Sequence, residues 1–132
     1  MINFFQLLKN AIVQAGCLHS RLNLFTKSMS DRIEVFKQML ESDPENTMVM
    51  FGLANEYLKA ENYANGIETL EKYLKFGTDE GAAYGMLAKA LEATGETEKA
   101  KAAYEKGIEV SLANGHPTMA EDYRQTLEFD YE

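Results

Sequence analysis

The chain has 132 residues, 45% of them hydrophobic and 26% charged, which fits one folded domain and excludes disordered and collagen-like proteins. No stretch approaches the roughly 20 consecutive apolar residues of a membrane-spanning helix, so we expect no membrane span. The 13 basic and 21 acidic residues give a net charge of −8, which opposes charge-driven binding to nucleic acid or anionic lipid. The single cysteine excludes an internal disulfide, and no Cys/His cluster has metal-binding spacing. We therefore expect a cytoplasmic protein without metal or cofactor.

Residues 1–28 are predicted to be an N-terminal extension, distinct from a helical domain at 29–132. Residues 1–30 contain three basic residues and no acidic residue, and their apolar residues recur every three or four positions, as in an amphipathic helix. Four interpretations remain open: an organelle transit peptide, a secretory signal, a helix docked on the domain, or a segment upstream of a natural start at Met29.

The domain is predicted to begin with a helix at 31–42, which ends before Pro44. Beyond it, the chain repeats itself with a period of 34 residues. A shift by this period superposes apolar residues on apolar residues: Met50 on Tyr84, Leu53 on Leu87, Ala54 on Ala88, Tyr57 on Leu91, Leu70 on Tyr104 and Leu74 on Ile108.

Each unit is predicted to hold two antiparallel helices, because apolar residues recur on one face of each segment. The first unit covers 47–76, with a turn at Glu61 and Asn62, and the second covers 81–112, with a turn at Gly95. Glycine at that place supplies the positive φ with which many helices end.

A last helix is predicted at 117–130, where Pro117 suits the first helical turn. Strict 34-residue spacing would bury polar residues of this segment, namely Glu121, Asp122 and Gln125. We therefore interpret it as the polar-backed cap that an open helical stack needs, and not as a third unit.

These units resemble the tetratricopeptide repeat, a helix-turn-helix motif with the signature W-x2-L-G-x2-Y, A-x3-F and P. The first unit corresponds to it at Met50, Leu53, Ala54, Tyr57, Gly66 and Leu70, and the second at Tyr84, Leu87, Ala88, Leu91, Ala100 and Tyr104. The closing proline is absent from both, although Pro44 holds that place after 31–42, which resembles the second helix of an incomplete repeat. The resemblance implies an all-α fold: an α-solenoid of antiparallel helix pairs wound into a right-handed superhelix.

In this family the first helix of each repeat lines a concave groove that binds a peptide or a helix of a partner protein. The resemblance therefore implies groove contacts from side chains outside the core: Met48, Phe51, Asn55, Leu58, Lys59, Ala82, Gly85, Met86, Lys89 and Glu92. Burial of Met48, Phe51 and Met86 under a neighbouring helix is the alternative interpretation. The family's carboxylate clamp for chaperone tails is disfavoured, because Phe51 and Met86 stand where that clamp has lysine and asparagine.

Catalysis has little support in the sequence. His19 lies in the extension and His116 in a turn, with no convincing nucleophile near either of them. The acidic pair Asp79-Glu80 is predicted at a helix start, where negative charge stabilises exposed N–H groups. We therefore predict a non-enzymatic protein-interaction module. The alternatives are a self-associating module, either a homodimer or a chain with its own N-terminal helix in the groove, and an accessory subunit of an enzyme complex.

Overall fold

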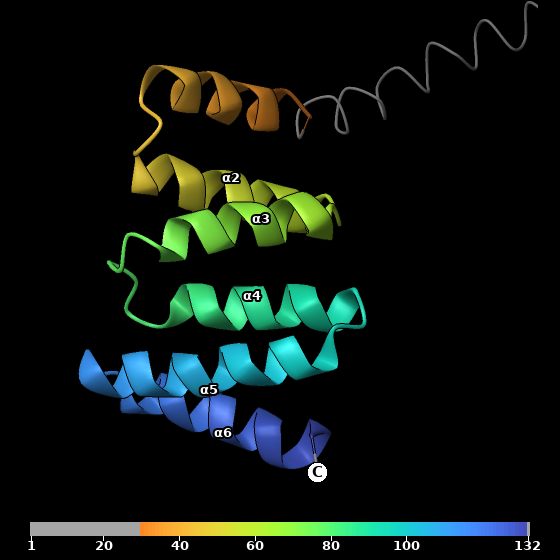
Figure 1. Cartoon of the computed structure of the whole chain (residues 1–132), viewed down its shortest axis with the longest axis vertical. Coiled ribbons are helices and arrows are strands. Elements are labelled where there is room, and N and C mark those ends of the chain that lie inside the picture. Colours follow the sequence, from red (N-terminus) through yellow and green to blue (C-terminus); the bar gives the residue numbers. More distant parts are fainter. Residues whose placement is uncertain (1–29, 132) are drawn as a thin grey trace, which may run out of the picture.

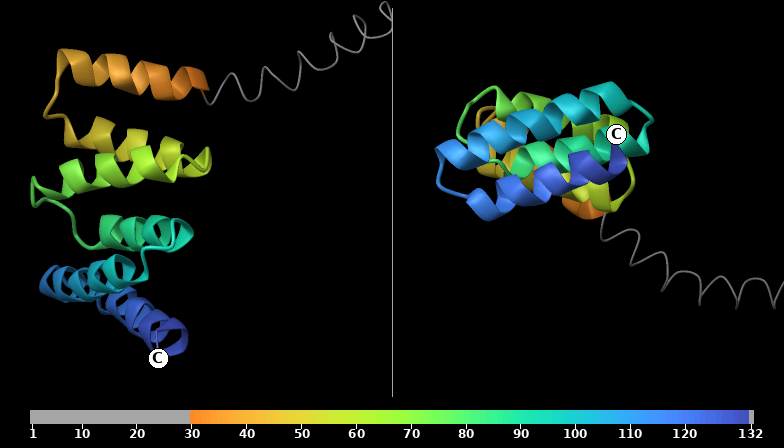
Figure 2. Two further views of the ribbon diagram at one scale, coloured as in Figure 1. Left: turned by 45° about the vertical axis from the view of Figure 1, so that its right-hand side comes forward. Right: turned by 90° about the horizontal axis from the view of Figure 1, so that it is seen from below.

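The computed structural model describes residues 30–131, and the interpretations of the N-terminal extension lie outside these residues. Residues 30–42 form a first helix. It is followed by α2 (Thr47–Lys59), α3 (Tyr63–Leu74), α4 (Ala82–Ala93), α5 (Thr97–Ala113) and α6 (Pro117–Asp130). The helices are stacked one on the next with alternating direction (Figures 1 and 2), and residues 30–131 contain no strand. The predicted all-α solenoid of antiparallel helix pairs is confirmed.

The turns after α2, α4 and α5 share one shape. In each, the N–H groups of the second and third residues after the helix donate to carbonyls three and five residues back, at 2.8–3.2 Å, which is the Schellman arrangement. The arrangement requires a left-handed residue, and φ is 80° at Gly95, 78° at Gly115 and 57° at Glu61. The α5–α6 connection is therefore a tight hairpin of the same kind as the connection within each repeat.

The α3–α4 connection differs from these turns. It runs through residues 75–81 and has positive φ at Gly77 (67°) and Gly81 (123°). This longer loop carries the polar residues Thr78, Asp79 and Glu80 to the end of the stack at which α4 begins (Figure 1).

The core follows the predicted apolar faces. Tyr57 on α2 and Leu91 on α4 are 6% and 3% exposed, so the first helix of each repeat buries the face that the 34-residue period indicated. The central cluster consists of Ala54, Leu70, Ala83, Leu87, Ala88, Leu91, Ala100, Ala103 and Tyr104. No helix within residues 30–131 has both the length and the apolar character needed to cross a membrane.

The last helix is held to the repeats by an aromatic side chain in a slot between two glycines. Tyr123 of α6 lies against Gly85 of α4 and Gly107 of α5, and its hydroxyl donates to the Gly81 carbonyl at 2.9 Å. Its ring also lies 5.6 Å from the ring of Tyr104. α6 therefore packs through Ala120, Tyr123 and Leu127, while Glu121, Asp122 and Gln125 stay exposed, as a cap requires.

Candidate functional site

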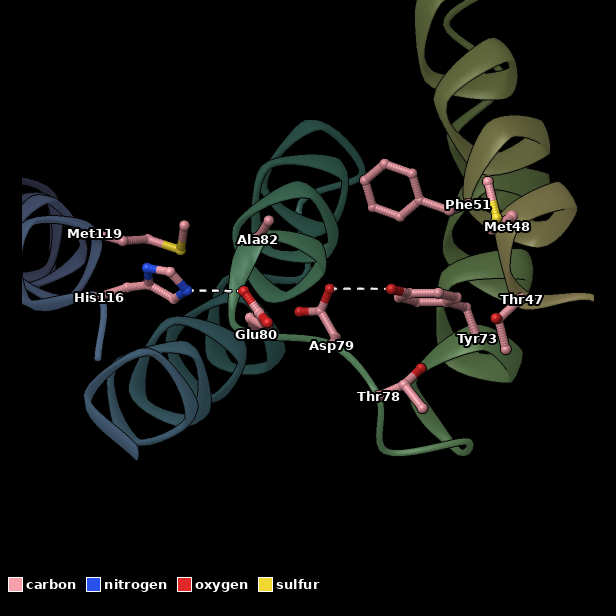
Figure 3. Close-up of a pocket in the computed structure, with 10 residues that line it drawn as sticks. All are labelled: Thr47, Met48, Phe51, Tyr73, Thr78, Asp79, Glu80, Ala82, His116 and Met119. Carbon is pink, nitrogen blue, oxygen red and sulfur yellow. Dashed lines mark hydrogen bonds and ion pairs between the residues drawn. The ribbon is translucent and has the colours of Figure 1, made fainter. Parts of the chain in front are cut away.

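A pocket of about 480 Å³ opens where α2, α4 and α6 begin (Figure 3). These helices stack with their starts at the same end, and the α3–α4 loop lies between them (Figure 1). The pocket is lined by Thr47, Met48, Phe51, Tyr73, Thr78, Asp79, Glu80, Ala82, His116 and Met119. Thr47 and His116 are 69 positions apart, so the pocket forms only when the hairpins stack.

One wall of the pocket is apolar and accessible. Met48 is 84% exposed, an unusual state for a methionine in a small helical domain. Phe51 beside it is half-buried and contacts Tyr73, with ring centroids 5.4 Å apart and ring planes inclined at 56°. Met119 of α6 supplies a second thioether across the pocket (Figure 3). The pocket thus offers a deformable apolar surface to a ligand.

Asp79 organises the polar side of the pocket. Its Oδ2 accepts from the N–H of Gly81 at 2.9 Å and of Ala83 at 3.0 Å, and its Oδ1 accepts from the Tyr73 hydroxyl at 3.2 Å. Burial, and next the charge of Asp79, raise the pKa of Tyr73, so its hydroxyl remains a donor at neutral pH. Asp79 therefore holds the start of α4 against the end of α3, the helix-start role predicted from the sequence.

Glu80 and His116 bridge the pocket from the α3–α4 loop to α6. The Glu80 Oε2 and His116 Nε2 atoms are 2.8 Å apart, and the two side chains are 66% and 41% exposed (Figure 3). An exposed pair of this kind adds little stability. It does fix the position of one carboxylate oxygen at the pocket edge.

The structure brings only part of the predicted groove set to this pocket. Met48, Phe51 and Ala82 line it, and the exposure of Met48 excludes its burial under a neighbouring helix. Met86 is half-buried against the core, so for this residue the alternative interpretation fits. Asn55 is half-buried and Lys89 is exposed, and neither lines the pocket.

Other members of the predicted set are engaged elsewhere in the fold. Leu58 packs on Gly66 of α3, and the Lys59 Nζ atom lies 3.6 Å from Oε1 of the buried Glu56. Glu92 accepts a 2.7 Å hydrogen bond from the Tyr131 hydroxyl. Gly85 is buried under Tyr123, which closes this position to a ligand.

Several lining residues were not predicted as site residues. No local sequence pattern marks a binding role for Tyr73, Thr78 or Met119. These residues lie at a helix end, in a loop and in the last helix, which come together only in the folded stack. His116 was interpreted as a turn residue, and it does lie in the turn directly before α6, but its ring reaches Glu80, 36 residues away. In the part of the chain that the structure describes, no group of three or more His, Cys, Asp or Glu residues is placed to hold a metal ion.

The fold and the pocket define a class, a short helical-repeat protein with an accessible cavity between its hairpins. Residues 81–114, which include α4 and α5, match the family model of the tetratricopeptide repeat. The chain is also similar to the TPR repeat-containing protein PA0015 of Pseudomonas aeruginosa, with 29% identity over 83 residues, or 63% of this chain and 79% of that protein. The predicted resemblance to tetratricopeptide-repeat proteins is confirmed, and it indicates a protein-interaction module as the general class of function.

Proposed function

We propose that this protein is a non-catalytic adaptor that binds a segment of a partner protein in the pocket between α2, α4 and α6. The observation that carries the proposal is Met48, which is 84% exposed at the pocket edge. An exposed apolar side chain beside a cavity is typical of a binding surface, whereas an isolated one on a flat face has no such meaning. The predicted cytoplasmic location belongs to this proposal.

The size of the pocket favours a peptide segment over a whole protein face. A volume of about 480 Å³ fits a few side chains, which is the scale of an anchor from a peptide or a helix. Recognition through such anchors concentrates the binding energy in a few contacts. Substitution of one lining residue should therefore abolish binding, while substitution of an exposed apolar residue outside the pocket should not.

The test uses two charge substitutions at exposed apolar residues. Met48→Glu alters the pocket, and Leu112→Glu alters α5 at a 46% exposed position outside it. The tagged full chain and both variants are used to capture proteins from the native host, with quantitative mass spectrometry. We expect one or more proteins to be retained by the parent chain and by Leu112→Glu and lost with Met48→Glu. Equal loss or equal retention in both variants would reject the pocket as the binding site.

The same samples distinguish the self-associating alternative. Sedimentation velocity of the full chain over a hundredfold concentration range measures its oligomeric state. A dimer that Met48→Glu dissociates, and Leu112→Glu leaves intact, would replace the adaptor proposal with a homodimer that uses this pocket.

A further inference from the structure

The charged side chains that line the pocket are acidic. Asp79 and Glu80 are adjacent, and residues 30–131 contribute no lysine or arginine to the lining. Figure 3 shows both carboxylates between two apolar walls, with Phe51 and Met48 on one side and Met119 on the other. Across its width the pocket therefore presents an apolar surface, then an acidic one, then a second apolar one.

Some N–H groups at the helix starts around the pocket already have acceptors. Free N–H groups at the start of a helix attract anions. Asp79 accepts the Ala83 N–H of α4 and the Gly81 N–H just before this helix, and the Asn46 side chain accepts the Val49 N–H of α2 at 3.2 Å. α6 begins with Pro117, which has no N–H group. Part of the donor capacity at these helix starts is therefore already used, and Asp79 and Glu80 supply the negative charge of the pocket lining.

The carboxylates keep acceptor capacity for a ligand. A carboxylate has about four lone-pair positions, and within residues 30–131 Glu80 is hydrogen-bonded through its Oε2, to His116. Its side chain is 66% exposed, so its other oxygen faces solvent or a ligand. An acidic ligand would be repelled by both carboxylates.

We infer that the pocket binds an arginine or lysine side chain flanked by apolar residues in the partner segment. This inference rests on the proposed function and names the chemistry of its ligand. The aliphatic stem of such a side chain lies along Met48 and Phe51 while its head reaches Glu80 and Asp79. Arginine is favoured over lysine because its planar group can bond two carboxylate oxygens at once.

The probes are 12-residue peptides selected from a random display library on the immobilised full chain. We expect the selected peptides to carry arginine or lysine within two positions of Leu, Met or Phe. The strongest binder is then synthesised in two forms, one with its arginine and one with citrulline at that position. Citrulline keeps the shape of arginine and removes the charge.

Affinities of both peptides are measured by fluorescence polarisation on the parent chain, Glu80→Gln and the matched control Glu105→Gln on α5. Asp79 is left unchanged because it caps α4. On the parent and on Glu105→Gln, citrulline should weaken binding roughly fivefold, the upper end of what an exposed charge pair contributes. On Glu80→Gln the same replacement of arginine by citrulline should weaken binding by about twofold or less. Equal losses on all three proteins would overturn the inference.

A pocket-wall variant, Met48→Ser, separates failure of the inference from failure of the proposed function. If Met48→Ser abolishes peptide binding but the selected peptides lack basic residues, the pocket binds peptides and the basic-ligand inference is wrong. If no peptide is selected, or Met48→Ser leaves binding unchanged, the pocket is not a peptide site and both proposals fail. Circular dichroism checks that each variant remains helical.

Discussion

Tyr123 of α6 lies so close to Gly85 of α4 that a β-carbon on Gly85 would stand 2.8 Å from two carbons of the tyrosine ring. Real β-carbons do not approach other atoms at this distance, so the contact exists only because residue 85 is glycine. The pocket depends on this contact, since it seats the helix that supplies His116 and Met119.

Gly85→Ala is expected to destabilise the protein. Helix propensity alone would favour alanine by up to about 1 kcal/mol, but overpacking against Tyr123 should cost roughly 1–3 kcal/mol. Urea unfolding of Gly85→Ala, Tyr123→Ala and the double variant measures the coupling between the two sites. The alanine at position 85 should cost less when Tyr123 is absent. A Gly85→Ala variant more stable than the parent would show that α6 does not pack here.

Glu61→Gly is expected to stabilise the protein. Glu61 has φ 57°, the left-handed conformation that glycine occupies in the equivalent turns at Gly95 and Gly115. Relief of this strain should contribute about 1 kcal/mol and raise Tm by about 4–8 °C for a domain of this size. Glu61→Ala is the control, because it removes the carboxylate but keeps the β-carbon. Equal melting temperatures for Glu61→Gly and Glu61→Ala would contradict the prediction.

Asp79→Ala should destabilise the protein by about 1–2 kcal/mol, the usual cost of a lost helix cap. The substitution removes the acceptor for Gly81 N, Ala83 N and the Tyr73 hydroxyl. Glu80→Ala, at the adjacent exposed position, should change the free energy of unfolding by less than about 1 kcal/mol. Thermal and urea unfolding of both variants check the contrast. If Asp79→Ala lowered the free energy of unfolding less than Glu80→Ala, Asp79 would not have the stabilising role assigned to it.

Stability is expected to fall above pH 10, because burial raises the pKa of Tyr104 and of Tyr123. A tyrosine in the unfolded chain titrates near pH 10, so below this pH both states hold the proton and the full stabilisation is present. At higher pH the unfolded chain loses the proton first, and stability is lost up to the folded-state pKa. Urea midpoints measured from pH 8 to 11 should drop more for the parent than for Tyr104→Phe. If the urea midpoints of the parent and of Tyr104→Phe fell equally with pH, Tyr104 would not be the source of the pH dependence.

The repeat architecture was predictable because the spacing of apolar residues along the chain is a local property that identifies each helix of a hairpin. Tyr57 and Leu91 lie 34 residues apart and are both buried. Gly95 marks a turn because glycine adopts the positive φ that this position has. Met48 and Phe51 were predicted to share a surface because they lie three positions apart in one helix, and both line the pocket. Gly85 and Glu92 were assigned to the open groove from the repeat phase alone, and α6 covers one and bonds the other through Tyr131.

The sequence by itself determined the number, the lengths and the buried faces of the helical hairpins, because side-chain periodicity decides which face of a helix leaves water. The tertiary structure alone decided where α6 lies and what surrounds the pocket. The Schellman turn at Gly115 makes α5 and α6 a tight hairpin and fixes the register of α6 against α5. That register brings His116 to Glu80 across 36 residues, a contact between side chains that no local pattern encodes.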